Sequence, residues 1–256
     1  LGVNIEAGYD VTVTTGTYTT ALTIDGSALD AANADNDSDG DIDNADSSAE
    51  ILTVTGTGAT AALNVIGGGA GDSITTGSAN DTVDGGAGND TITSTAGNDT
   101  LSGGAGNDTF VMTGLTASDT IDGGDGTDTL QVTSLVATSL TGVTNVENIK
   151  LNSATAVSLA TDLPFTTIDL TDPATGNVGP ESLTLALGYT AETTVKMDAG
   201  DTLVNTGADA VVTVVADADD LEAADSTTVT GSDKVGVTNS MTITTTGEGT
   251  ADVVAT

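Results

Sequence analysis

The sequence predicts an all-β chain whose central part is a solenoid of stacked repeat units. Apolar residues, mostly Val, Ile and Leu, alternate with polar ones in short runs such as ALTID, ILTVTG and SLTLAL. In the middle of the chain aspartate recurs every nine residues, and an apolar residue follows each one two places later. Helical patterns are scarce, with SALDAANAD and DLEAAD the only short candidates.

The first 66 residues (1–66) form an N-terminal β segment that contains an acidic insertion. Alternation predicts strands that lead into the central repeats. These strands are expected over residues 11–14, 18–24, 51–55 and 62–66.

The insertion, DNDSDGDIDNAD at residues 35–46, has the spacing of an EF-hand calcium loop. Gly40 stands at loop position 6, and Asp46 replaces the usual Glu at position 12, which predicts weaker binding because its side chain is shorter. The loop resembles that of dockerins, and a solvated acidic loop is the alternative. The candidate ligands are Asp35, Asp37, Asp39, Asp41 and Asp46.

Residues 67–131 repeat a unit of nine residues. The aspartates are Asp72, Asp81, Asp90, Asp99 and Asp108, followed after a two-residue insertion by Asp119 and Asp128. The apolar residues two places later are Ile74, Val83, Ile92, Leu101, Phe110, Ile121 and Leu130. Because one unit cannot bury its apolar residue alone, stacked units must share a core. A glycine-rich linker would not explain these apolar residues.

The pattern Gly-Gly-x-Gly-x-Asp-x-apolar-x is complete at residues 85–93, 103–111 and 123–131, and residues 67–75 carry it with displaced glycines. It resembles the hemolysin-type calcium-binding nonapeptide repeat of the RTX family of secreted bacterial proteins. The resemblance implies a parallel β-roll with calcium-binding turns, in which two nonapeptides form each coil. Further β-strand-rich segments would flank this roll.

A roll of this kind places alternate turns on opposite edges. The glycine-rich turns hold Asp72, Asp90, Asp108 and Asp128, and the glycine-poor turns hold Asp81, Asp99 and Asp119. Glycine permits positive φ and close backbone approach, and calcium needs about 6–8 oxygen ligands. We therefore expect stronger calcium binding on the glycine-rich edge, in turns that include Gly85, Gly86, Gly88, Gly103, Gly104 and Gly106. The asparagines before the aspartates are expected to be structural.

Residues 132–256 form a β-rich C-terminal segment in which the strict period is lost. Its segment TGVTNVENIKLNS resembles one that often follows such repeats in bacterial surface-layer proteins. A continued solenoid and a β-sandwich are both compatible with its pattern. Short strands are expected at residues 149–151, 157–159, 167–170, 183–187, 194–197, 211–215 and 241–243.

Composition narrows the possible functions. The net charge is −35, from 38 acidic and 3 basic residues, and the chain has no histidine or cysteine. So few positive charges argue against a nucleic-acid partner, and the sequence has no apolar run long enough for membrane insertion. Without histidine or cysteine the chain lacks Ser–His and Cys–His arrangements, so we expect no enzyme activity. Calcium is the expected cofactor.

These features predict a calcium-dependent structural protein, secreted to the bacterial cell surface. It would assemble with copies of itself into a surface layer or filament, and it resembles surface-layer proteins of the Caulobacter type. Acidic stretches at residues 217–225 and 198–201 are expected to hold calcium between subunits. The alternative is a calcium-stabilised module of a secreted RTX adhesin, which would hold cell-surface polysaccharide, or the tail of a secreted enzyme.

Two smaller expectations complete the sequence analysis. The stretches TVTTGT and TITTT resemble the threonine files of ice-binding solenoids, but two isolated stretches do not make the flat array that such files need. The chain starts at Leu1 with no recognisable signal peptide, so we expect a processed protein or a fragment.

Overall fold

The structure is a computed structural model. It describes residues 2–4, 10–17, 19–29, 51–133, 137–152, 157–159, 165–171, 182–185, 193–197, 201–205, 212–217, 227–230, 241–246 and 253–255. The chain divides into two compact units. Unit 1 comprises Leu1–Gln131 and Ser139–Val146, and unit 2 comprises Val132–Thr138 and Glu147–Thr256.

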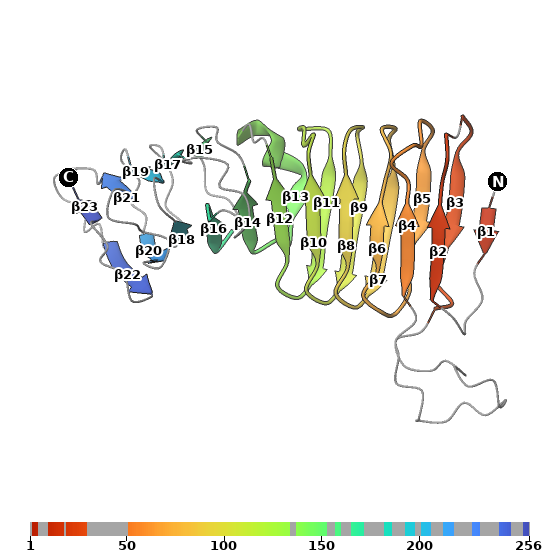
Figure 1. Ribbon diagram of the computed structural model, residues 1–256, viewed down its shortest axis with the longest axis horizontal. Coiled ribbons are helices and arrows are strands. Elements are labelled where there is room, and N and C mark those ends of the chain that lie inside the picture. The colour runs from red at the N-terminus through yellow and green to blue at the C-terminus, as the bar shows by residue number, and fades with distance from the viewer. Residues whose placement is uncertain are drawn as a thin grey trace, which may run out of the picture. The chain divides into compact units, whose positions relative to one another are not determined.

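Unit 1 is built from parallel strands that alternate between two sheets (Figure 1). The odd sheet contains β1 (Gly2–Asn4), β3 (Leu22–Asp25), β5 (Leu63–Ile66), β7 (Thr82–Ala87), β9 (Thr100–Ala105), β11 (Thr120–Asp125) and β13 (Val143–Thr144). The even sheet contains β2 (Val11–Thr14), β4 (Leu52–Thr55), β6 (Ser73–Thr75), β8 (Thr91–Ser94), β10 (Thr109–Met112) and β12 (Thr129–Val132). Each strand pairs with the strand two places along the chain, so two strands make one coil.

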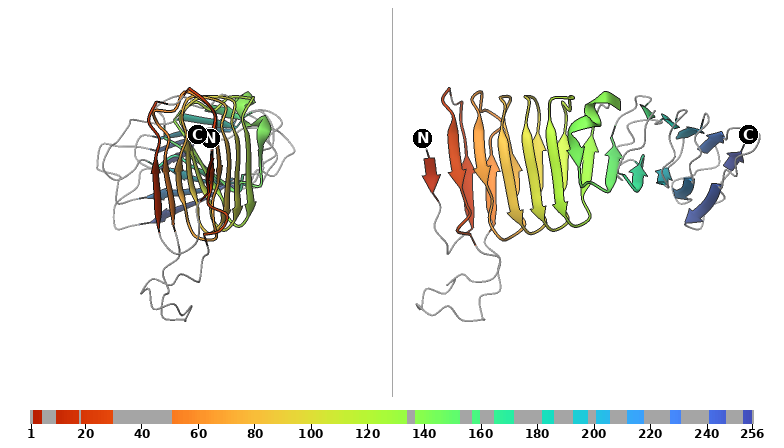
Figure 2. Two further views of the ribbon diagram at one scale, coloured as in Figure 1. Left: turned by 90° about the vertical axis from the view of Figure 1, so that its right-hand side faces the viewer. Right: turned by 180° about the vertical axis from the view of Figure 1, so that it is seen from behind.

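The nine-residue repeat sets the register between coils. Thr91 of β8 pairs with Thr109 of β10, and Thr82 of β7 pairs with Thr100 of β9, each pair separated by two repeats. The views from the end and from behind in Figure 2 show the two sheets as opposite walls of the coils. The expected all-β parallel roll is confirmed.

The core of unit 1 lies between these walls and is almost entirely aliphatic. The seven apolar residues that follow the repeat aspartates all point inward, and none is more than 2% exposed. In the even sheet, Ile74, Ile92 and Phe110 occupy the same register position on successive coils. Stacking therefore buries a continuous row of side chains that no single repeat could bury alone.

Strand positions follow the alternation pattern closely, with small shifts at the ends. The run predicted at residues 18–24 forms β3 only from Leu22, and the turn after it at Ser27 is held by the Asp25 carboxylate. The sequence did not predict the short 3-10 helix η1 (Ala137–Gly142). It also did not predict β1, β13 or the strands at residues 202–205, 227–230 and 253–255. Among the described residues, no helix has the length and apolarity needed to cross a bilayer. Both helical candidates of the sequence lie mostly or wholly outside the described residues.

Unit 2 also consists of parallel coils. One sheet orders β14 (Asn148–Leu151), β16 (Thr167–Asp169), β18 (Thr193–Met197), β20 (Val212–Asp217) and β22 (Met241–Thr246). The other orders β15 (Val157–Leu159), β17 (Ser182–Leu185), β19 (Thr202–Asn205), β21 (Thr227–Thr230) and β23 (Val253–Ala255). This is a solenoid pattern, whereas a β-sandwich would need antiparallel sheets.

The coils of unit 2 stack the same kind of core without a fixed repeat length. Ile149, Ile168 and Val195 pair in register on β14, β16 and β18, and each is at most 1% exposed. Their numbering shows that the loops between these strands differ in length from coil to coil. The length of the repeat therefore depends on the loops between the strands. Stacking of the coils requires only that each strand carry an inward apolar residue.

The inward row makes a testable prediction. Replacing Ile92 by alanine should lower the free energy of unfolding by about 2–5 kcal/mol, because it leaves a cavity between Ile74 and Phe110. Thr91→Ala, on the exposed side of the same strand, should change it by less than about 0.5 kcal/mol. Denaturant unfolding of the calcium-loaded protein measures both, and equal losses would contradict the assigned inward row.

Candidate metal centre

The repeat aspartates form a buried file along each edge of unit 1. On the glycine-rich edge the backbone N–H of each aspartate donates to Oδ1 of the aspartate in the next coil. The three N···O distances, from Asp72 to Asp90, from Asp90 to Asp108 and from Asp108 to Asp128, are each 2.7 Å. Every one of these carboxylates is at most 3% exposed. One oxygen of each aspartate therefore ties neighbouring coils together.

The opposite edge repeats the same link. The Asp81 N–H donates to Oδ1 of Asp99 at 2.8 Å, and the Asp99 N–H donates to Oδ1 of Asp119 at 2.8 Å. These carboxylates are likewise almost fully buried. The two edges thus share one scaffold, and they differ in the surroundings of the second carboxylate oxygen, Oδ2.

On the opposite edge, Oδ2 is satisfied by the protein itself. The Ser94 hydroxyl donates to Oδ2 of Asp99. The Thr116 hydroxyl and backbone N–H donate to Oδ2 of Asp119, at 3.2 and 2.7 Å. The Gly77 N–H donates to Oδ2 of Asp81 at 3.2 Å. We call this edge, with Asp81, Asp99 and Asp119, the hydroxyl edge.

On the glycine-rich edge, two second oxygens have no such donor. Within the described part of the chain, Oδ2 of Asp90 and Oδ2 of Asp108 are buried and accept no hydrogen bond. Leaving a buried charged oxygen unsatisfied is costly, so these two atoms call for a cationic partner.

Glycine leaves room for that partner. A Cβ atom built on Gly85 would collide with Oδ2 of Asp90, and one built on Gly103 would collide with Oδ2 of Asp108. Ser94 holds the position on the hydroxyl edge that Gly85 holds here, five residues before the aspartate, and its hydroxyl fills the corresponding space. At this pair of positions, glycine leaves the space beside the carboxylate open and serine fills it.

The backbone of the complete turns also requires glycine. Gly86 and Gly88 have φ values of 101° and 107°, and the equivalent glycines of the next two turns are also positive. Such angles are strained for other residues. Gly85 and Gly103 lie directly beside the carboxylates with unpaired oxygens, and Gly86, Gly88, Gly104 and Gly106 belong to the same turns and pack against backbone of the preceding coil.

The first turn of the glycine-rich edge differs from the others. Ala70 stands where the complete turns have their fourth-position glycine, and neither Gly68 nor Ala70 has a positive φ. Here the Gly68 N–H donates to Oδ2 of Asp72 at 2.8 Å. Asp72 is therefore satisfied by backbone alone, which the displaced glycines of residues 67–75 hinted at in the sequence.

Burial raises the pKa values of five of the repeat aspartates, some on each edge. Desolvation is the largest cause at Asp72, Asp81, Asp90, Asp99 and Asp108. It raises the pKa of Asp90 to about 7, and repulsion from the carboxylates of Asp108, Asp72 and Asp84 acts in the same direction. A cation beside these carboxylates would replace the proton that burial favours.

The asparagines that precede the aspartates are structural, as expected. Oδ1 of Asn89 accepts the Asn107 N–H at 2.8 Å, and Oδ1 of Asn80 accepts the Asn98 N–H at 2.9 Å. Oδ1 of Asn107 accepts the Thr127 N–H at 2.9 Å. These amides tie neighbouring turns together, so their oxygens already have donors.

The EF-hand-like loop at residues 35–46, with Asp35, Asp37, Asp39, Asp41 and Asp46, lies outside the described residues, so its calcium assignment stays a prediction.

Sequence reasoning missed Ser94 and Thr116, whose hydroxyls satisfy the hydroxyl edge. The signal was present: a hydroxyl residue stands within the turn, three to five places before the aspartate.

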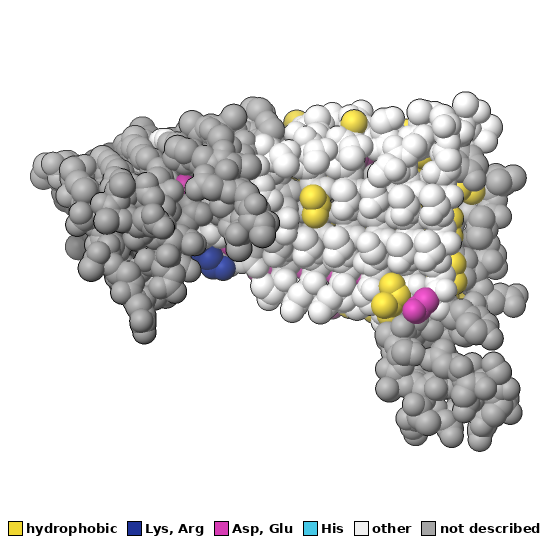
Figure 3. All heavy atoms as spheres, viewed as in Figure 1, with side chains coloured by type: hydrophobic (Ala, Val, Ile, Leu, Met, Phe, Trp, Pro, Cys, Tyr) yellow, Lys and Arg dark blue, Asp and Glu magenta, His cyan; other side chains and the backbone are white. Residues whose placement is uncertain are grey.

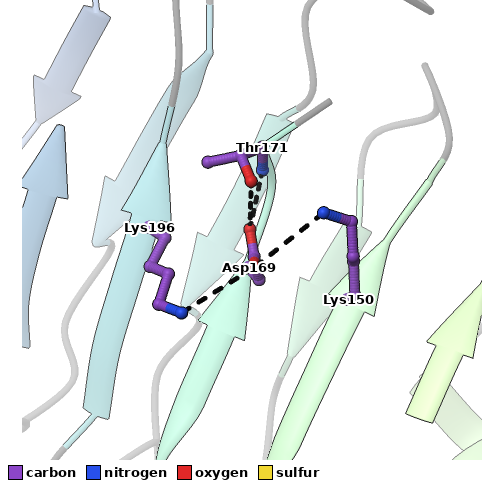
Figure 4. Close-up of polar contacts among 4 residues, drawn as sticks. All are labelled: Lys150, Asp169, Thr171 and Lys196. Atoms are coloured by element: carbon purple, nitrogen blue, oxygen red, sulfur yellow. Dashed lines mark hydrogen bonds and ion pairs between the residues drawn. The ribbon is translucent and has the colours of Figure 1, made fainter. Parts of the chain in front are cut away.

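Unit 2 contains one charged cluster in its described part (Figure 4). Lys150 on β14 and Lys196 on β18 pair in register with Asp169 on β16, between them. Both ammonium groups lie 3.9 Å from Oδ2 of Asp169, whose Oδ1 accepts the Thr171 hydroxyl at 2.7 Å. Two of the three lysines in the chain thus form a cross-strand ion pair network on the sheet surface.

The two files of aspartates lie in a segment that matches a known family of repeats. The RTX calcium-binding nonapeptide repeat (4 copies) matches residues 66–101, 85–111 and 111–131. This segment is similar to RTX repeats, and RTX repeats bind calcium. The match covers the aspartates of both edges, and calcium is accordingly the cofactor of the roll. Comparison with curated proteins and with solved structures found no match.

The residues of the RTX segment fit calcium. Among the described residues no three acidic side chains gather in one place, so a cation must take most of its oxygens from backbone carbonyls. The glycine turns bring backbone close to Oδ2 of Asp90 and Oδ2 of Asp108. Hard oxygen donors with a buried anionic atom are the ligands that calcium prefers.

The difference between the edges predicts unequal effects of mutation. Asp90→Ala should reduce calcium binding more than Asp99→Ala, because Oδ2 of Asp99 already has the Ser94 hydroxyl as its donor. Each variant removes one link between coils, and Asp99→Ala also removes the Ser94 hydrogen bond, so a larger calcium loss in Asp90→Ala would not come from a larger structural cost. Calcium titration by calorimetry compares them. A loss for Asp99→Ala as large as that for Asp90→Ala would contradict the assignment of the two edges.

The raised pKa of Asp90 predicts how metal-free stability depends on pH. The folded pKa is about 7, whereas an unfolded aspartate titrates near 4, so the folded chain holds the extra proton between these values. Stability should therefore be greatest below about pH 4 and fall as pH rises towards about 7. Circular dichroism of calcium-free protein across this range tests it. Asp90→Asn should weaken the dependence, and an undiminished slope in that variant would contradict the prediction.

Proposed function

We propose that this chain is a calcium-dependent structural protein that works outside the cell. The supporting observation is the pair of buried, unpaired oxygens, Oδ2 of Asp90 and Oδ2 of Asp108, beside turns that a cation can enter. RTX repeats typically belong to secreted proteins, and extracellular fluid supplies calcium that the cytosol lacks. Calcium would supply the positive charge that this acidic chain itself cannot supply.

The proposed ligands are the carboxylates of Asp90, Asp108 and Asp128 with backbone carbonyls of the turns that precede them. Asp72, Asp81, Asp99 and Asp119 are proposed as weaker or purely structural positions, because the protein already donates to Oδ2 at each of them. This arrangement would place the bound calcium mainly on one edge of the roll.

Calcium binding is proposed to drive folding. A chain with net charge −35 repels itself, and unit 1 buries seven repeat aspartates. Calcium at about 100 times the dissociation constant of a site adds about 2.7 kcal/mol, so three sites add about 8 kcal/mol. That is comparable with the whole stability of an ordinary domain. Export as an unfolded chain followed by folding on contact with calcium would suit these magnitudes.

Assembly with copies of itself into a surface layer or filament is the finer proposal. Three calcium ions on the glycine-rich edge, one on the hydroxyl edge and one in the 35–46 loop would leave roughly −25 of the charge, so neighbouring copies need further calcium between them. Asp201 is fully buried, which removes it from the stretch 198–201 as a bridging ligand. The acidic stretch 217–225 stays the proposed place for such calcium. We further propose that the chain is not an enzyme, which its lack of histidine and cysteine supports.

A calcium titration followed by circular dichroism and light scattering tests folding and assembly together. Bridging ions share exposed ligands, so we expect β structure at lower calcium and large particles at higher, millimolar calcium. Full β structure in excess chelator at neutral pH would contradict calcium-driven folding. A folded protein that stays monomeric at every calcium level would instead support a module of a secreted RTX adhesin or the tail of a secreted enzyme.

A further inference from the structure

The outward side of the even sheet carries two parallel files of side chains, nine of the ten bearing a hydroxyl group, which we call the threonine face. One file consists of Thr12, Thr53, Ser73, Thr91 and Thr109, and the other of Thr14, Thr55, Thr75, Thr93 and Val111. Members of a file are register partners on β2, β4, β6, β8 and β10. The flat array that two isolated sequence stretches could not provide is therefore present, assembled from five strands.

The threonine face is uncharged, which is unusual in this chain. Its ten positions include no acidic or basic residue, although the chain carries 38 acidic residues. Figure 3 shows the corresponding surface as a broad, flat area almost free of acidic side chains. On the odd sheet, by contrast, Asp25, Asp84 and Asp122 share one outward file. Strand geometry alone therefore does not exclude carboxylates from outward positions.

The hydroxyls of this face are free to bind an external partner. None of the hydrogen bonds made by the described residues uses a side-chain hydroxyl of these threonines. Their β-branched side chains have restricted χ1 angles, so each hydroxyl and methyl group is held in a fixed direction. A rigid array of this kind loses little entropy when it binds an ordered surface.

The composition of the face disfavours most other partners. Protein partners are usually anchored by large apolar, aromatic or arginine side chains, and the only large hydrophobic residue exposed in the described chain is Ile51. Sugar rings stack on aromatic side chains, of which the face has none. Nucleic acids and acidic polymers need positive charge. What remains is a partner that is itself flat, uncharged, regular and rich in hydrogen-bonding groups.

We propose that the threonine face binds ice. Neighbouring strands place hydroxyls about 4.7–4.9 Å apart, and the two files on one strand lie about 6.6–6.8 Å apart. Both repeats are close to oxygen–oxygen repeats in the crystal planes of hexagonal ice. Hydroxyls can therefore join the water lattice while the threonine methyl groups occupy the spaces between. The proposal requires the folded roll but is independent of its assembly into a layer.

Growth of a single ice crystal in calcium-loaded protein tests this. We expect the protein to shape the crystal, to hold the freezing point below the melting point, and to enter slowly growing ice. Thr75→Tyr with Thr93→Tyr, in the centre of the second file, should abolish most of the freezing-point depression. Thr100→Tyr, at an exposed position of the odd sheet, is the matched control and should leave it unchanged. Circular dichroism confirms that each variant is folded.

Three results would overturn the proposal. The first is a folded, calcium-loaded protein that neither shapes ice nor enters it. The second is an equal loss of ice activity in the Thr100→Tyr control. The third is the loss of a different interaction in Thr75→Tyr with Thr93→Tyr. If this variant dissolves an oligomer, the face binds another copy of the chain. If it releases the protein from insoluble cellulose, the face binds a neutral polysaccharide. None of these results depends on the calcium-driven folding transition, which the chelator experiment tests separately.

Discussion

The structure of unit 1 depends on burying one carboxylate in every turn of the roll. Oδ1 of each such aspartate accepts a backbone N–H from the preceding coil at 2.7–2.8 Å. The donor is Leu52 at Asp72, Leu63 at Asp81 and an aspartate at each later position. This link holds the coils in register along both edges. It also brings negative charge into a poorly solvated place, which is why the pKa values of Asp90 and Asp108 are raised. The fold therefore buries carboxylates whose negative charge needs hydrogen-bond donors or a cation beside it.

The two edges differ in how the second oxygen of each buried carboxylate is satisfied. Ser94 and Thr116 satisfy Oδ2 of Asp99 and Asp119 from within the chain, so the hydroxyl edge is complete without a cation. Gly85 and Gly103 leave the space beside Asp90 and Asp108 open. A self-satisfied edge can hold the register of the coils, while the open edge, under the proposed calcium-driven folding, would make the stability of the same coils depend on calcium. One scaffold would then combine a fixed side with a metal-responsive side.

Charge is also distributed unevenly over the surfaces of the chain. Outward acidic side chains occur on the odd sheet of unit 1, whereas the threonine face of the even sheet has none. In unit 2, Lys150 and Lys196 converge on Asp169 rather than standing alone. In a protein with net charge −35, this uneven distribution of charge keeps the threonine face neutral, while the repeat carboxylates lie along the two edges of the roll.

The all-β class, the stacked repeats, the inward apolar residues and the calcium turns could all be predicted from sequence, because each depends on local spacing. A period of nine places every Asp and every following apolar residue at equivalent points, whatever lies next to them. The state of each Oδ2 atom was decided by tertiary structure, since Ser94 and Gly85 matter only through the space beside a carboxylate in the folded turn. The threonine face likewise could not be predicted from the sequence, because Thr14, Thr55 and Thr75 come together only when separate coils pair in register.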